Sequence, residues 1–101
     1  IYSANCYFKP TYHLGYAAVR SDSDMLNELN FVKHSADKFD PLLASDEQEI
    51  STGHNSMIEV DGQLYVVYHG RDASSDCHSD DRTARICKLI AANGTLTVEK
   101  I

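Results

Sequence analysis

The stretch STGHNSMIEVDGQLYVVYHGRD, residues 51–72, holds two runs of strand-forming residues on either side of Asp61-Gly62. An Asp-Gly pair between such runs is among the strongest short-range signals for a β-hairpin, because both residues tolerate positive φ. The first run is preceded by the polar segment 53–56, in which Gly53 lets the chain bend. The stretch therefore predicts a hairpin whose first strand begins beside a polar bend.

A second turn signal, Asn93-Gly94, extends this hairpin into a meander. β-branched and aromatic residues fill the segments between the turns, as strands require. We therefore predict four consecutive strands in the second half of the chain, at residues 55–60, 63–70, 83–91 and 95–101.

The first half resembles the same unit with its beginning missing. The runs IYSANCY and YHLGYAAV, residues 1–7 and 12–19, match the later strands at an offset of about 66 residues, and a repeat at a fixed offset is typical of propellers. Its last strand is expected around 31–34. A short helix from Ser23 to Leu29, with Ser23 as its N-cap, is the competing interpretation of the segment before it.

The segment LYVVY is apolar on both faces of a strand. A strand of a two-layer sandwich keeps one polar face, whereas a propeller blade is covered by neighbouring blades on both sides. The pattern favours an all-β fold of stacked four-stranded sheets. We assign residues 51–101 to one complete blade and residues 1–50 to a partial blade with a connecting segment.

Composition limits the possible functions. The chain has 101 residues, 43% of them hydrophobic and 24% charged, as in globular proteins. A net charge of −6 argues against nucleic acid as a partner, and no run is long and apolar enough to span a membrane. The cysteines, Cys6, Cys77 and Cys87, fit no zinc motif and are expected to be free thiols, which favours a cytoplasmic location. Secretion is also compatible with the sequence, because a chain that starts at Ile1 is expected to be processed or to be part of a longer one.

The acidic residues do not reveal a catalytic pair. Glycoside hydrolysis usually needs two carboxylic groups, one acting as acid and one as base or nucleophile. The carboxylates of the polar segments are all predicted to be solvated surface groups: Asp22, Asp24, Asp37, Asp40, Asp46, Glu47 and Glu49. The loop 72–81, with Asp76, Cys77, His78, Asp80 and Asp81, mixes soft and hard ligands without a known metal spacing, so a charged surface loop is the better interpretation.

The segment GHNS offers three neutral polar groups, His54, Asn55 and Ser56, at the start of a strand. From the residues alone, a structural histidine is still the favoured interpretation of His54. His13, His34 and His69 fit that interpretation more closely, and His69, which precedes Gly70, simply ends a strand in it. Residues alone leave both interpretations open.

Two longer stretches resemble one enzyme family. YSANCYFKPTYHLGYAAVRSDS and TGHNSMIEVDGQLYVVYHGRD are similar, in order and spacing, to two stretches of glycoside hydrolase family 43. Members are five-bladed β-propellers that act on arabinose- and xylose-containing saccharides. The resemblance covers essentially the whole chain and implies that it is the C-terminal portion of such a propeller, with the inner strand of the first blade missing.

The resemblance also implies roles for individual residues. His54 corresponds to a histidine at the base of the active-site funnel, which contacts a central calcium, often through water, or the catalytic acid. Asn55 would brace it and contact substrate. Arg82, in preference to Arg85, corresponds to an arginine that points at the bound sugar. In the alternative interpretation, both arginines are solvated ion-pair partners of Asp80 and Asp81.

In the family, the catalytic acid, the base and the residue that tunes the acid come from earlier blades, so none is expected in this chain. We expect the isolated chain to be inactive and to contribute one wall and the floor of a sugar pocket. The alternative is a non-catalytic carbohydrate-binding or self-associating fragment, since an open blade edge invites pairing with the rest of the propeller or with another copy. Sugar identity and exo or endo cutting lie beyond these residues.

Overall fold

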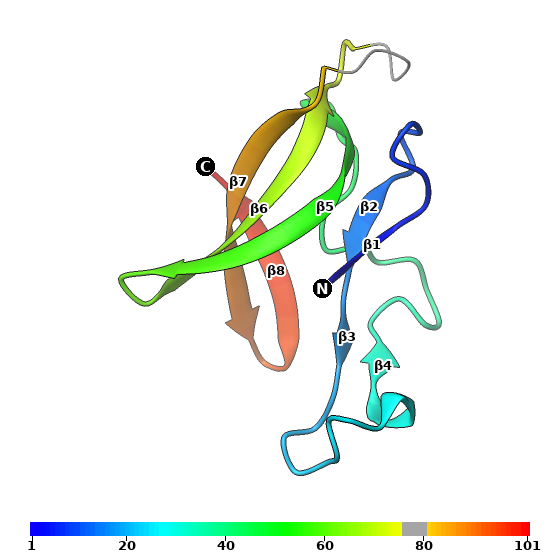
Figure 1. The fold of residues 1–101 in the computed structure, drawn as a ribbon, viewed down its shortest axis with the longest axis vertical. Helices are drawn as coiled ribbons and strands as arrows, with labels where there is room; N and C mark the ends of the chain where they lie inside the picture. The colour runs from blue at the N-terminus through cyan, green and yellow to red at the C-terminus, as the bar shows by residue number, and fades with distance from the viewer. Residues whose placement is uncertain (76–80) are drawn as a thin grey trace.

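The computed structural model describes residues 1–75 and 81–101, and nearly all regular structure in them is β (Figure 1). The second half forms one antiparallel sheet of four strands in the order β5-β6-β7-β8. The strands are β5 (Glu49–Val60), β6 (Gln63–Asp72), β7 (Thr83–Ala92) and β8 (Thr95–Lys100). The predicted meander and the predicted all-β fold class are both confirmed.

The two predicted hairpin turns are present. Asp61 and Gly62 have φ values of 51° and 80°, and Asn93 and Gly94 have 54° and 76°. Positive φ at both central positions defines the type I′ turn, whose twist matches that of the strands it joins. Each turn therefore sets the register of its pair, Val60 opposite Gln63 and Ala92 opposite Thr95.

Strand β5 begins at Glu49, earlier than the predicted start at residue 55. The pairing with β6 slips between Ile50 and Gly53 and again between Gly53 and Ser56, so two β-bulges interrupt the ladder. Ser51 and His54, one in each slip, have φ values of 56° and 55°. The polar segment is thus a doubly bulged part of the strand, because each bulge absorbs one extra residue and pairing then resumes.

The first half contains two short antiparallel pairs. β1 (Tyr2–Ala4) pairs with β2 (His13–Gly15), and β3 (Ala17–Ala18) pairs with β4 (Val32–Lys33). In Figure 1, β3 continues the line of β2, with β1 beside β2 and β4 beside β3. The predicted strand around 31–34 is therefore found as β4.

The competing helix from Ser23 to Leu29 is wrong. Only a single 3-10 turn, η1 (Glu28–Asn30), forms there. Side chains explain the difference, because Asp24 Oδ1 accepts a hydrogen bond from the N–H of Leu26 and Asn27 Oδ1 accepts one from the N–H of Leu29. Such local bonds compete with helical hydrogen bonds and favour turns.

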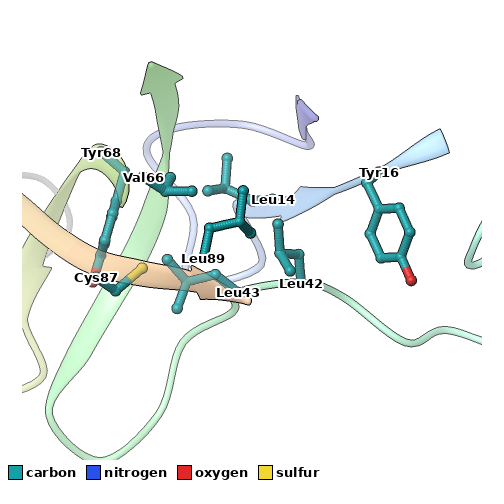
Figure 2. Packing of buried hydrophobic residues seen from close by; sticks show 8 residues of the cluster. All are labelled: Leu14, Tyr16, Leu42, Leu43, Val66, Tyr68, Cys87 and Leu89. Atoms are coloured by element: carbon teal, nitrogen blue, oxygen red, sulfur yellow. The ribbon is translucent and has the colours of Figure 1, made fainter. Parts of the chain in front are cut away.

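The core lies between the two halves (Figure 2). Leu14 and Leu43 are held together by main-chain hydrogen bonds and face Val66 and Leu89 of the large sheet. Cys87 is also buried there, and burial raises the pKa of its thiol to about 11, so the thiol stays protonated. The core cluster consists of Leu14, Tyr16, Leu42, Leu43, Val66, Tyr68, Cys87 and Leu89.

Beside the core, Glu49 is buried, which corrects the prediction that it is a solvated surface group. Its carboxylate accepts a hydrogen bond from the Tyr68 hydroxyl at 2.7 Å and pairs with Arg85 at 3.3 Å and Lys100 at 2.8 Å. Burial opposes the charge of Lys100, but hydrogen bonds to Asp46 and Glu49 outweigh it and raise the pKa of the amine. The cluster joins the start of β5 to the end of β8.

Replacing Glu49 by Gln tests this cluster. The substitution keeps the shape and removes the charge, which leaves Arg85 and Lys100 without their shared buried anion. We expect a loss of about 3 kcal/mol in the free energy of unfolding, as measured by urea denaturation. Glu47→Gln, at an exposed neighbouring position, is the control and should change stability by less than about 0.5 kcal/mol. Equal effects of the two substitutions would contradict the structural role of Glu49.

Candidate functional site

His54 sits at the second bulge of β5. Its backbone N–H donates to the Ser3 hydroxyl of β1 at 2.7 Å, and its side chain is exposed. Positive φ is unfavourable for a residue with a side chain, so the bulge persists because the surrounding contacts hold it. Asn55 follows, half-buried. The bulge therefore turns the His54 imidazole to the surface while the backbone stays anchored to the other half of the chain.

Three rings line up beside this bulge. The His54 and His69 ring centroids are 5.7 Å apart, and Tyr12 stacks on His69 at 5.8 Å. Gly53, opposite His69 in the ladder, makes room for Tyr12, since a Cβ at Gly53 would come within 2.0 Å of the Tyr12 ring. The series Tyr12, His69, His54 thus runs from the first half of the chain to the exposed imidazole.

His69 is neutral at pH 7. Burial lowers the pKa of His69 below its ordinary value, and the positive charges around it, that of Arg82 first, lower it further. Its Nδ1 atom is buried and has no hydrogen-bond partner among residues 1–75 and 81–101. A neutral imidazole can accept a hydrogen bond at one nitrogen and donate at the other. His69 is therefore a polar, uncharged support for His54.

The two candidate arginines have different surroundings. The Arg85 guanidinium pairs with Asp72 at 2.8 Å and Glu49 at 3.3 Å and is one-fifth exposed, so it belongs to the buried ion cluster. Arg82 is exposed, its guanidinium lies 5.0 Å from the centroid of the Tyr7 ring, and its charge acts on His69. Both arginines lie at the same end of the sheet as the histidines. Arg85, opposite Tyr68 in the ladder, belongs to the buried ion cluster, whereas Arg82 lies over Tyr7 and acts on His69.

The loop that mixes metal-ligand types is described only in part. Asp76, Cys77, His78 and Asp80 lie outside the described residues, while Asp81 pairs with the buried Arg71. Within the described ranges, no group of three His, Cys, Asp or Glu side chains is arranged to hold a metal ion, and no helix is long and apolar enough to cross a membrane. Cys6 and Cys87 are free thiols, as predicted.

Sequence reasoning missed three residues that position His54. Tyr12 and Ser3 come from the first half of the chain, and the sequence predicts His69 only as a structural histidine near the end of a strand. The pairs Gly53-His54 and Tyr68-His69 lie on the two strands of one predicted hairpin, so their proximity was predictable from the sequence. The contribution of Tyr12 was not, because it depends on how the two halves pack.

Comparisons with known proteins agree with this architecture. No protein-family model and no curated protein matches the sequence. Among solved structures, the chain is similar to a thermostable family-43 glycoside hydrolase, with a TM-score of 0.76 and 33% identity over 98% of this chain. The chain spans 30% of the length of that protein.

The fold is thus that of part of a β-propeller. The particular family recognised in the two sequence stretches, glycoside hydrolase family 43, is confirmed by the similarity to that solved structure. The comparison covers the fold as a whole and does not assign the roles of His54, Asn55 and Arg82, which stay predictions.

Gly53→Ala tests the packing that supports His54. The added methyl group must displace the Tyr12 ring, and we expect the free energy of unfolding to fall by about 1–3 kcal/mol. In a Tyr12→Ala background the ring is absent, so the same substitution should cost less than half as much. Denaturant unfolding of the four proteins in this cycle measures the coupling. An equal cost in both backgrounds would show that Tyr12 does not depend on Gly53.

Proposed function

We propose that this chain is the C-terminal part of a glycoside hydrolase that cleaves arabinose- or xylose-containing polysaccharides or oligosaccharides. The observation that carries the proposal is the similarity to the family-43 hydrolase over 98% of the chain at 33% identity. In this proposal residues 51–101 form a complete blade and residues 1–50 a blade without its inner strand. A cytoplasmic location stays a prediction.

The chain's contribution is to bind and orient the sugar. The exposed His54 imidazole and the Asn55 amide offer hydrogen bonds to sugar hydroxyls, and the Arg82 guanidinium offers a rigid set of donors. The neutral His69 keeps the adjoining surface polar without a further charge. Together these groups form one wall and the floor of a pocket.

The catalytic carboxylates come from outside this chain in the proposed mechanism. An inverting enzyme holds its acid and base about 6.5–9.5 Å apart to admit a water molecule. The carboxylate of Glu49 is buried, but its charge is already neutralised by Arg85 and Lys100. It therefore acts in folding and has no free proton-transfer role. Because the catalytic pair is proposed to lie outside this chain, we expect the isolated chain to be inactive.

Calcium fits this chain only indirectly. Ca²⁺ takes six to eight oxygen ligands, whereas the bulge offers the imidazole nitrogen of His54, and no metal-ligating cluster occurs in the described part of the chain. Calcium stays a prediction for the whole protein, in which His54 would contact the ion through water. No step of the proposed chemistry depends on it.

A second candidate function is a non-catalytic, self-associating propeller fragment. It is favoured by the edge position of β5, where Met57, Ile58 and Val60 are all about half exposed. An exposed apolar edge strand offers unpaired backbone groups to another chain. Sedimentation of the isolated chain separates the two cases, because a stable monomer would contradict obligatory assembly.

The proposed function is tested in the complete polypeptide that contains this chain. We expect hydrolysis of 4-nitrophenyl α-L-arabinofuranoside or β-D-xyloside, and a loss in kcat/KM of about 100-fold on His54→Ala or Arg82→Ala, comparable to the loss of one well-placed donor. His34→Ala is the control, because His34 pairs with the exposed Asp40 away from the site and should leave kcat/KM within twofold. Full turnover by the isolated chain, or an unchanged kcat/KM in the His54 variant, would refute the proposal.

A further inference from the structure

Two exposed aromatic rings stand next to the arginine of the site. Tyr7 and Phe8, in the loop between β1 and β2, are 39% and 44% exposed, and their ring centroids are 4.1 Å apart at an angle of 34°. The Arg82 guanidinium lies over the Tyr7 ring at 5.0 Å. Exposed aromatic side chains that gather in one place commonly mark a binding surface.

The loop that carries these rings is held by side chains of the large sheet. The Arg71 side chain is fully buried, and its Nη1 donates to the Tyr7 carbonyl at 2.9 Å. The Ser51 hydroxyl at the first bulge of β5 donates to the Lys9 carbonyl at 2.9 Å. These bonds fix the backbone on both sides of Phe8, so the rings are preorganised and lose little conformational freedom on binding a ligand.

The loop lies at the same end of the molecule as the start of β5 and the end of β6 (Figure 1). Arg82 connects it to the histidines, because this arginine both covers Tyr7 and acts electrostatically on His69. The bulge that presents His54 and the bulge that anchors the loop through Ser51 belong to the same strand. The aromatic pair is therefore continuous with the candidate site.

We propose that the Phe8 ring, with Tyr7 packed behind it, is a stacking platform for a neutral saccharide unit beyond the one held at His54, with Arg82 donating hydrogen bonds to its hydroxyls. This rests on the proposed carbohydrate function. The C–H face of a sugar ring is apolar and matches an aromatic surface, while its hydroxyls match a guanidinium. Two rings are too small for a protein interface, which buries about 800 Å² on each partner, and the net charge of −6 disfavours nucleic acid.

The test is binding of xylohexaose and arabinohexaose to the 101-residue chain, followed by ¹H–¹⁵N NMR. We expect shifts at residues 7, 8 and 82 with at least one saccharide, and an affinity about tenfold weaker for Phe8→Ala, the size of a lost aromatic contact. Phe31→Ala is the matched control, because Phe31 is 40% exposed beside η1 and β4. It should keep the wild-type affinity, and both variants should keep the wild-type spectrum elsewhere.

Equal affinity of Phe8→Ala and wild type, or the absence of shifts at residues 7 and 8 with both saccharides, overturns the platform. If His54→Ala weakens binding and Phe8→Ala does not, the platform fails while the proposed function stands. Failure of the proposed function shows separately, as unchanged kcat/KM of the His54 variant in the complete polypeptide.

Discussion

The structure depends on the contact between the Tyr12 ring and Gly53. A side chain at residue 53 would occupy the space of the ring, so the absence of a Cβ lets the first half of the chain pack against the edge strand of the large sheet. The same contact sets Tyr12 against His69, which in turn lies beside His54. One glycine therefore serves both the packing between the halves and the geometry of the site.

The two faces of the large sheet carry different chemistry at this end. On the core side, Glu49 is neutralised by Arg85 and Lys100, which fixes where β5 starts. On the other side, the two bulges turn Ser51 and His54 out of the ladder, Ser51 to hold the loop of Tyr7 and His54 to face solvent. Because the strand start is fixed by buried charges, the bulges fall at defined positions, and the polar groups they present are held in place.

How much the sequence predicts depends on the range of the interactions involved. The Asp61-Gly62 and Asn93-Gly94 turns are local, and they were predicted with the correct strand pairs. The burial of Glu49 was not, since its partner Lys100 lies at the far end of the last strand.

The start of β5 was missed for a related reason. Ser51 and His54 adopt positive φ only because contacts from the first half stabilise the bulges, among them the bond from the His54 N–H to Ser3. The family resemblance pointed to His54 and Arg82, yet the separation of Arg82 from Arg85 required the packing, because both precede the same apolar run.

The second face of the large sheet explains why LYVVY is apolar throughout. Val66 and Tyr68 are buried against the first half, whereas Tyr65 and Val67 are half-buried on the opposite face. Their neighbours on that face are more exposed still, Ile58 at 44%, Ile86 at 42% and Ile90 at 37%. An apolar face of this kind is stable in water only when another layer covers it. In the propeller that we propose, a further blade against this face would supply that layer, and the same assembly would bring the proposed catalytic carboxylates toward His54.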